Sequence, residues 1–598
     1  MSSSDEAHRL QNPSARRLRS KRVYHSSSDD SVSDPRVKSS DRVPITRSRI
    51  SLRSSSEEDG ITVRRKGAEH RRVRRSAEKN LKNAERDPRK HSRSSSFVFD
   101  HPMVQHARTS SYAMYQQSVD IARNTISELD LPASSWCGFF AAAMLAVTLG
   151  EVVKINNAQP TPYMDEAFHV RQAQHYCAGN WTVWDKKITT LPGLYLLTAV
   201  IAHCAGAVTG KPNIHWCSLE KLRFVNIVMS VLIFVVMYTI FRKLSRRLKD
   251  DPGLGIQPIH RTCCMMNSLV LTCFPLLYFY NLLYYTDVGS VLFVLASYSC
   301  SIRNHHLKSA MLGAISVLFR QTNIIWVGFT AGTVVIRDIE NRGWLQQSDD
   351  FVSQMKIAVT VIFRYFWQYL LLLLPYLTVL AGFAVFIFVN GGIVVGDKSA
   401  HTAVLHFPQF LYFLLFLTAF SLPHMVQRLR HSHLTVLYYV FKPVHVLLFF
   451  VSAVLALYFF KYEHPYLLAD NRHYTFYIWR KILNRTPYTM FYLLPVCFYT
   501  FLNIVALLST VHSKFFTLLY FLCVATQIVP QGLLEFRYFI LPYLLYRLHV
   551  PQHSWVVLFL ELCQYTLINL ITVKLFLNKT FDWDITDHLT PNPQRFMW

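Results

Sequence analysis

Charged residues are scarce in this sequence. Asp, Glu, Lys and Arg together make up 17% of its 598 residues, against roughly 25% in an average soluble domain. Hydrophobic residues account for 51%, and they gather in blocks such as 370–389, which contains no charged residue. Because about 20 apolar helical residues cross a bilayer core, the pattern excludes an ordinary soluble protein and predicts an all-α polytopic membrane protein.

Paired-cysteine motifs are also missing. The eleven cysteines form no Cys-x-x-Cys pair and show no zinc-ligand spacing, so the sequence predicts neither a disulfide scaffold nor a metal site. Six of them lie within apolar runs, where a free thiol behaves as a small hydrophobic side chain. These six are Cys204, Cys273, Cys300, Cys497, Cys523 and Cys563.

The N-terminal part lacks large apolar residues and a sustained hydrophobic period. Residues 1–120 are rich in Ser and short basic clusters, and such a segment cannot bury enough surface to offset its ordering entropy. It also has no apolar stretch of the signal-peptide kind. We expect a disordered basic tail over 1–134 and a membrane domain over 135–598. RNA binding by the tail is an alternative, but interleaved aromatic residues are missing, so no nucleic-acid partner is expected.

The first apolar block, 136–153, is expected to be a signal anchor. Since basic segments stay on the cytosolic side of a membrane, we expect a cytosolic tail and a lumenal loop over 154–190. That loop contains the sequon Asn180-Trp181-Thr182, and its use as a glycosylation site would agree with a lumenal position.

Further apolar blocks bring the expected number of transmembrane helices to about 12–14. They cover 192–208, 224–241, 268–285, 288–302, 311–336, 357–389 (one or two pieces), 407–422, 444–460, 490–508, 515–529, 539–548 and 556–577. Strict alternation would place the basic stretch 242–249 on the lumenal side, against the charge rule. Either one early block is not a full span, or this stretch is an exception.

Two adjacent carboxylates, Asp165 and Glu166, stand in the loop 154–190. Neighbouring carboxylates at a membrane surface are costly unless they bind a cation or titrate. One could accept a proton from a sugar hydroxyl as a general base while the other orients the donor or the loop. The alternative is that the pair merely caps a short interfacial helix.

The wider sequence around this pair resembles a known family. The loop reads Pro-Tyr-Met-Asp-Glu-Ala-Phe-His over 162–169 and Ile-Thr-Thr-Leu-Pro-Gly-Leu-Tyr over 188–195. The similarity continues at 222–226, 278–287, 319–326, 390–398, 466–477, 534–542 and 594–598. Together these segments resemble the dolichyl-phosphate-glucose α-1,2-glucosyltransferases of the endoplasmic reticulum over about 135–598.

The resemblance implies a GT-C fold whose active site opens to the lumen of the endoplasmic reticulum. It implies dolichyl-phosphate-glucose as donor, a diglucosylated dolichyl-diphosphate-linked oligosaccharide as acceptor, and membrane lipids around the protein. One in-line displacement would turn a β-linked donor into an α-linked product, which requires a base and stabilisation of the departing phosphate. No nucleotide sugar takes part, so no metal or other cofactor is expected. In the family pattern the first acidic residue is the base, which assigns that role to Asp165 and a supporting role to Glu166.

Five basic residues are candidates for binding the donor phosphate. An arginine fork suits phosphate oxygens, and an ionisable residue inside an apolar run is a functional candidate. The candidates are Arg320, Arg472, His473, Arg537 and Lys398.

Each candidate has a structural alternative. The arginines at 320, 472 and 537 could instead form ion pairs with Asp287, Asp470 and Glu535. For Arg537 an interfacial lipid headgroup is a further alternative. His473 could be a packed neutral imidazole, and Lys398 could simply extend to the membrane interface.

A transporter or channel-associated protein is the alternative function. Helices broken by Gly and Pro, together with buried charges, suit substrate passage. However, the sequence shows no matching pair of interrupted segments, and its acidic pair lies in a loop rather than at a helix centre. Transfer of a sugar at one membrane face therefore remains the favoured prediction.

Overall fold

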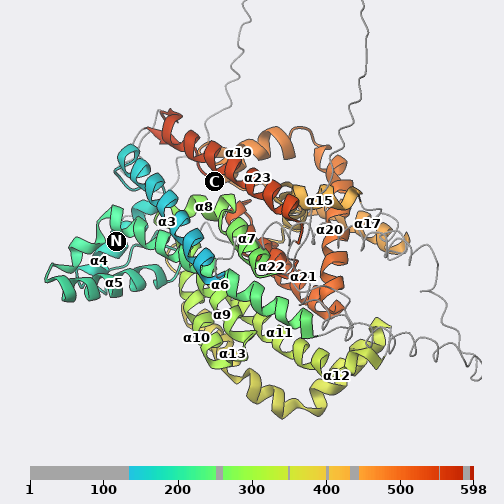
Figure 1. Cartoon of the computed structure of the whole chain (residues 1–598). Helices are drawn as coiled ribbons and strands as arrows, with labels where there is room; N and C mark the ends of the chain where they lie inside the picture. The colour runs from blue at the N-terminus through green and yellow to red at the C-terminus, as the bar shows by residue number, and fades with distance from the viewer. Residues whose placement is uncertain are drawn as a thin grey trace, which may run out of the picture. The chain divides into compact units, whose positions relative to one another are not determined.

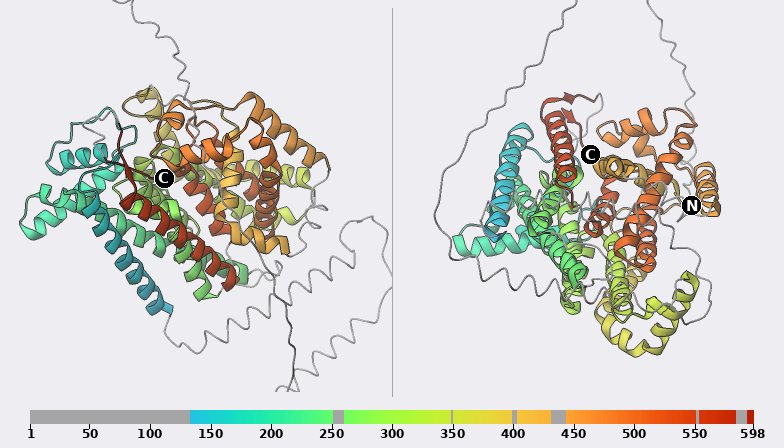
Figure 2. Two further views of the ribbon diagram at one scale, coloured as in Figure 1. Left: turned by 90° about the horizontal axis from the view of Figure 1, so that it is seen from above. Right: turned by 45° about the vertical axis from the view of Figure 1, so that its right-hand side comes forward.

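The structure is a computed structural model that describes residues 133–250, 260–347, 350–398, 403–430, 443–550, 553–583 and 593–598. The expected tail over 1–134 lies outside the described residues except for its last two positions. Within these ranges the chain is built mainly of α-helices (Figure 1). Both views in Figure 2 place the blue-to-teal helices, which come first in the described chain, at one edge of the bundle and the orange helices at the other.

The helices are numbered in chain order. The earlier helices are α3 (Ala133–Ala158), α4 (Glu166–Cys177), α5 (Gly193–Thr209), α6 (Leu219–Asp250), α7 (Arg261–Thr272), α8 (Pro275–Asn281), α9 (Thr286–Ser301), α10 (His306–Phe319), α11 (Ile324–Asn341), α12 (Phe351–Arg364) and α13 (Phe366–Asn390). The later helices are α14 (Pro408–Phe420), α15 (Leu422–Arg430), α17 (Pro443–Phe459), α18 (Pro465–Ala469), α19 (Tyr474–Ile478), α20 (Thr489–Val511), α21 (Lys514–Ile528), α22 (Ile540–His549) and α23 (Trp555–Asn578). Two short strands, β1 (Thr580–Phe581) and β2 (Gln594–Arg595), pair antiparallel near the end of the chain.

The long apolar helices confirm the predicted class. Among the described residues, α3, α6, α13, α20 and α23 are long and apolar enough to cross a membrane, and the bent pair α7–α8 would make a sixth span. Another five apolar helices have 10–17 residues: α5, α10, α14, α17 and α21. The described helices that could each cross a membrane alone are thus fewer than the 12–14 spans expected. Several of the expected spans are shortened or interrupted by polar residues and proline.

Two expected spans are broken, which corrects the prediction of continuous helices over 268–285 and 311–336. The first bends by 66° between α7 and α8, where Phe274 precedes Pro275 and a proline disfavours helical geometry in the residue before it. The second is interrupted at Arg320, whose backbone is extended (φ −150°, ψ 125°) between α10 and α11. The interruption lets the Arg320 side chain reach Asp287 on the neighbouring helix α9.

Helix α5, expected as a span over 192–208, packs beside α4 instead (Figure 1). It leads into a short 3₁₀ helix, η1 (Asn213–Cys217), and a disulfide joins Cys217 to Cys177 at the end of α4.

Helix α6 begins next to the end of α3. The contact is a hydrogen bond in which Arg223 donates to the side-chain oxygen of Asn156 at 2.6 Å. The chain therefore enters α6 on the same side as α4. The 32 residues of α6 span roughly 48 Å, so the basic stretch 242–249 lies far along this helix from the contact with Asn156.

The disulfide corrects one expectation about cysteine. The sequence predicted no disulfide scaffold, and the structure contains one bridge, Cys177–Cys217, across 40 residues. The six cysteines expected to be free within apolar runs are free. Neither bridged cysteine belongs to a spacing motif, so the pairing depends on the approach of η1 to α4, which the sequence does not encode locally.

A buried ion pair fastens α4 to α6. The guanidinium of Arg223 donates from Nε to Glu166 Oε1 at 2.8 Å and from Nη2 to Oε2 at 2.6 Å. Both side chains are fully buried. The same carboxylate accepts the backbone N–H of Tyr163 at 3.0 Å and that of Tyr284 at 2.8 Å. Glu166 thus joins three segments: the loop before α4, the first turn of α6 and the loop before α9.

Replacing Glu166 by glutamine should destabilise the protein strongly. The amide would leave the Arg223 charge buried and uncompensated, which typically costs about 3–5 kcal/mol. The measurement is thermal unfolding of purified protein in detergent. The matched control is Glu463→Gln, which removes a partly exposed pair with Lys461 and should change stability by less than about 1 kcal/mol. Equal melting temperatures for the two variants would contradict the role given to Glu166.

Candidate active site

The acidic pair of the sequence is split by the fold. Glu166 has no exposed surface, whereas the side chain of Asp165 is 49% exposed. Asp165 directly precedes α4, but its side chain makes no capping hydrogen bond to that helix. The alternative in which both carboxylates simply cap a helix therefore does not describe the pair, and the Asp165 carboxylate is accessible to solvent.

Arg537 lies beside Asp165 and is surrounded by acidic groups. Its Nη1 is 3.5 Å from Asp165 Oδ2 and 3.9 Å from Asp287 Oδ2, and its Nη2 bonds Glu535. Arg537 stands in a short 3₁₀ helix, η6 (Phe536–Phe539), between α21 and α22. Burial opposes ionisation of Glu535, but the adjacent Arg537 charge prevails and lowers the pKa of Glu535 to about 2. This ion pair consequently persists across the physiological pH range.

Arg320 approaches the same group of charges from the break between α10 and α11. Its Nη2 is 2.9 Å from Asp287 Oδ1, so Asp287 stands between two arginines with one carboxylate oxygen toward each. The Asp287 side chain is 3% exposed, and those of Arg320 and Arg537 are 16% and 14% exposed. Within the described chain, Nε of each arginine is buried without a hydrogen-bond partner.

A cavity adjoins this charged group. Its lining includes Asp287, Arg320, Asn323, Gln527 and Arg537. Asn323 is held by Ser290 at 2.8 Å. The guanidinium groups of Arg320 and Arg537 thus line one cavity, and a guanidinium is a group that binds phosphate oxygens well.

His169 is a further buried group near Asp165 that the sequence reading did not select. It lies one helical turn beyond Asp165, and its Nδ1 is 2.6 Å from the Tyr195 hydroxyl. Burial is the main reason that its pKa is lowered to about 4. The imidazole is therefore neutral at physiological pH and adds no charge next to Asp165.

Arg472 and His473 lie near the end of the chain rather than at Asp287. Arg472 forms the ion pair with Asp470 that was its structural alternative, at 2.8 Å between Nη2 and Oδ2, and its guanidinium lies 4.2 Å from the Trp583 ring centroid. Burial favours protonation of Asp470, but the hydrogen bond from Arg472 overcomes it and lowers the pKa of Asp470. His473 Nδ1 is 3.0 Å from the carbonyl oxygen of Trp598.

Lys398 is exposed, and its Nζ donates to the carbonyl oxygen of Asn390 at the end of α13. The loop before it packs on the loop that follows α4: Asp397 N donates to Lys186 O at 2.8 Å. Gly396 permits this approach, because its φ is +70° and an added Cβ would lie 2.4 Å from Lys186 O. Lys398 therefore satisfies a helix C-terminus, where a cation is favourable.

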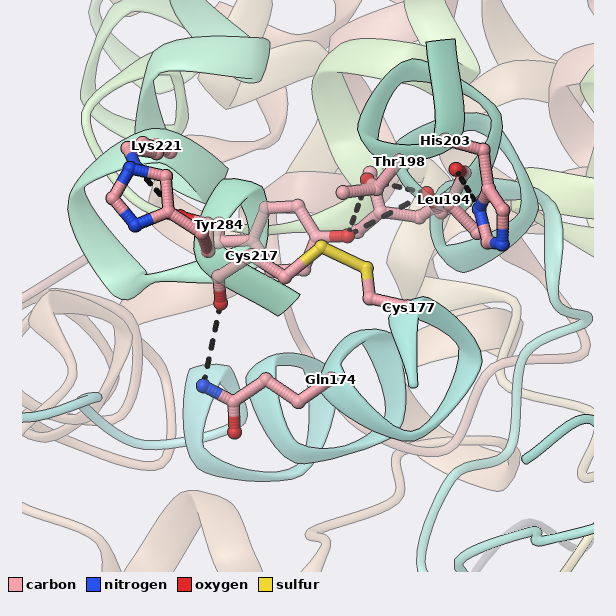
Figure 3. The surroundings of a disulfide bond; sticks show 10 residues. Gln174, Cys177, Leu194, Thr198, His203, Cys217, Lys221 and Tyr284 are labelled. Atoms are coloured by element: carbon pink, nitrogen blue, oxygen red, sulfur yellow. Dashed lines mark hydrogen bonds between the residues drawn. A yellow bond between two sulfur atoms is a disulfide. The ribbon is translucent and has the colours of Figure 1, made fainter. Parts of the chain in front are cut away.

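The disulfide lies at the C-terminal end of α4, the end away from Asp165 (Figure 3). The Cys177–Cys217 bridge is accompanied by a hydrogen bond from Gln174 Nε2 to the Cys217 carbonyl at 3.3 Å. Thr198 of α5 bonds the Tyr284 hydroxyl at 2.7 Å. Asn180 of the sequon is exposed, three positions after Cys177. The disulfide, α5 and the sequon thus all lie in the segment from Asp165 to Cys217, whose end is joined to α4 by the disulfide.

Asp287 and Arg223 are the site residues whose importance sequence reasoning underestimated. Asp287 was considered only as a possible partner of Arg320, and Arg223 only as part of the similar segment 222–226. The available signal for both was a charge at the edge of an apolar run. Such a charge indicates that a partner exists, but it does not identify that partner.

Comparison with known proteins places the chain in a family. A model of the DIE2/ALG10 family matches residues 159–548. A human protein named Dol-P-Glc:Glc(2)Man(9)GlcNAc(2)-PP-Dol alpha-1,2-glucosyltransferase is 40% identical over 484 residues, covering 77% of this chain and 98% of that protein. Proteins of the same name from two other organisms also match. The one from Arabidopsis thaliana is 33% identical, and the match covers 74% of this chain and 96% of that protein. The one from Drosophila melanogaster is 30% identical, and the match covers 78% of this chain and 99% of that protein. No solved structure matches the chain significantly. The matched range contains Asp165, Arg320 and Arg537, and the chain belongs to the DIE2/ALG10 family.

Proposed function

We propose that the chain transfers glucose from dolichyl-phosphate-glucose, in α-1,2 linkage, to a diglucosylated dolichyl-diphosphate-linked oligosaccharide. The names of the family relatives state this donor, acceptor and linkage. The single structural observation that supports it is the accessible Asp165 carboxylate beside Arg537, which together with Arg320 lines a cavity. A base next to anion-binding groups is what glycosyl transfer from a lipid phosphate requires.

In the proposed reaction, Asp165 accepts the proton of the attacking acceptor hydroxyl. The hydroxyl oxygen forms a bond to the anomeric carbon of the donor glucose, and the bond from that carbon to the phosphate oxygen breaks. Dolichyl phosphate leaves with the bonding electron pair, and the configuration at the anomeric carbon inverts. No metal takes part in this scheme, and activity that persists with a chelator would support that.

The departing phosphate is assigned to Arg537 and Arg320. Asp287 holds both guanidinium groups, and Glu535 holds Arg537 from another side. These pairings fix the arginines before the donor arrives, so little reorganisation is needed when charge develops on the phosphate. Arg472, His473 and Lys398 have protein partners at other places and are assigned to supporting loops of the site.

We further propose that this multi-pass protein lies in the endoplasmic reticulum membrane with Asp165 on the lumenal side and the tail over 1–134 in the cytosol. Three features of the structure support the orientation. The disulfide Cys177–Cys217 belongs in an oxidising compartment, Asn180 is exposed nearby, and an α5 that packs beside α4 without crossing the membrane would leave 242–249 on the same side as the basic tail.

Asp165→Asn should lower kcat by about 10²–10⁴-fold while acceptor binding is largely retained, because the amide keeps the shape but cannot accept the proton. The measurement is steady-state transfer from synthetic donor to diglucosylated acceptor. The matched control is Asp338→Asn, which alters a partly exposed ion pair with Arg342 on α11 and should leave kcat unchanged. Near-wild-type turnover of Asp165→Asn would overturn the mechanism.

Arg537→Ala and Arg320→Ala should each weaken use of the donor. A charge-assisted contact to phosphate is worth roughly 1.5–3 kcal/mol, which corresponds to about 10–150-fold in kcat/KM. Arg472→Ala should cost less, since Arg472 does not line the cavity that Arg320 and Arg537 reach, and Arg342→Ala serves as an exposed control. A larger loss of kcat/KM in Arg472→Ala than in the other two variants would indicate that the donor phosphate binds near 470–473 instead.

Asn180 should carry a glycan. Further sequons begin at Asn484 and Asn578, so the expected readout is the loss of one glycan in Asn180→Gln relative to wild type after endoglycosidase treatment. Thr182→Ala removes the same sequon through a different residue and should give the same gel mobility. Equal gel mobility of wild type and both variants before endoglycosidase treatment would contradict the use of this sequon and remove its support for the proposed orientation.

Removing residues 1–120 should leave turnover within about twofold of wild type, because this segment lies outside the matched range 159–548 and across the membrane from the proposed site. The measurement is transfer by purified truncated protein, supplemented by restored glycosylation in cells that lack the endogenous enzyme. Loss of turnover in a folded, correctly localised truncated protein would show that the tail takes part.

A further inference from the structure

Residues 594–598, called the strap below, lie among the helices of the bundle. In all three views of Figures 1 and 2 the mark for the C-terminus falls between helices rather than at the rim. Gln594 and Met597 are at most 1% exposed, and Arg595 is 6% exposed. A segment of this depth makes specific contacts at both of its ends.

The first end of the strap binds the loop that precedes Asp165. The backbone N–H of Arg595 donates to the Tyr163 hydroxyl at 2.8 Å, and that hydroxyl donates to the Arg595 carbonyl at 2.6 Å. Burial raises the pKa of Tyr163 to about 12, so the hydroxyl keeps the proton it donates. The Arg595 guanidinium adds bonds to Ala158 O at 2.6 Å and to Gln159 Oε1 at 2.9 Å. Two further bonds from Nη1 go to carbonyls at the end of α23.

These contacts hold Tyr163 from several directions at once. Its backbone N–H donates to Glu166, and its carbonyl accepts from Glu166 N at 3.2 Å and from the Tyr285 hydroxyl at 3.3 Å. The next residue, Met164, has a φ of +58°, a left-handed conformation that is uncommon outside glycine. Such a backbone persists only where the surroundings over-determine it. Asp165 follows immediately, so the direction of its carboxylate depends on this turn.

The other end of the strap, Met597 and Trp598, contacts Tyr280 and Arg472. The Tyr280 hydroxyl donates to the Trp598 carbonyl at 2.7 Å, and the Tyr280 ring lies 5.6 Å from the Arg537 guanidinium. Met597 N donates to Arg472 O at 2.9 Å. The strap therefore spans from the turn that carries Asp165 to the ring that packs against Arg537.

We infer that the strap is a positioning element of the active site: through Tyr163 and Met164 it sets the Asp165 carboxylate relative to Arg537. This inference rests on the proposed function, because it concerns the placement of the proposed base. The competing possibility is a plain structural anchor that fastens the end of the chain to α23. An anchor would affect stability, whereas a positioning element affects turnover in a folded protein.

The test starts with Tyr163→Phe, which removes the hydroxyl but keeps the ring that packs on Phe576. We expect kcat to fall by about 10–100-fold, since small misplacements of reacting groups cost this much, with KM within threefold of wild type. Arg595→Lys, which loses the fork, should give the same pattern. The matched control is Tyr369→Phe, which loses a hydroxyl bond to Asp338 at 2.8 Å and should keep wild-type kcat.

Restoring turnover with a second substitution distinguishes a positioning element from a structural anchor. Glycine occupies a positive φ at no steric cost, so Met164→Gly in the Tyr163→Phe background should restore at least a third of the lost turnover. Unchanged kcat in Tyr163→Phe and Arg595→Lys would overturn the inference, and so would a loss that glycine at 164 does not relieve or that follows the melting temperature. Turnover by the wild-type protein in the same assay reports on the proposed function separately.

Discussion

The buried pair of Glu166 and Arg223 is the interaction on which the arrangement of the site depends. A fully buried carboxylate needs both a countercharge and hydrogen bonds to every lone pair. Glu166 obtains them from one guanidinium and two backbone N–H groups that belong to three separate segments. Because those segments cannot move apart without exposing an uncompensated charge, the loop before α4 has a fixed position beside α6 and α9. The accessible Asp165 inherits that position as its immediate neighbour.

The charged groups around Arg537 form a connected set of ion pairs. One guanidinium stands among Asp165, Asp287 and Glu535, and Asp287 is shared with Arg320. Each group is held by an opposite charge, so the site is nearly balanced before any ligand arrives. Arg320 stands at a helix break and Arg537 in a short 3₁₀ helix, and irregular backbone at membrane depth is typical of the lining of a site.

The class of the protein and most helix positions could be predicted from the sequence, because long apolar blocks have few other uses. The breaks at Phe274 and Arg320 were harder, since a single proline or arginine inside an apolar run is compatible with a kink, a break or an intact helix. The acidic pair was found, but its division into a buried and an exposed carboxylate depends on Arg223, which lies far along the chain. The disulfide and the contacts of Arg595 with Tyr163 likewise join distant positions without any local sequence signal.

Three helices begin at the cavity beside Arg320 and Arg537: α9 at Thr286, α11 at Ile324 and α22 at Ile540. The peptide dipoles of a helix sum to a partial positive charge at its N-terminus, so the backbone itself adds a positive potential at this point from three directions. This potential has no pKa and cannot be removed by replacing a side chain. This potential would favour an anion that binds beside Arg320 and Arg537, as the proposed reaction requires.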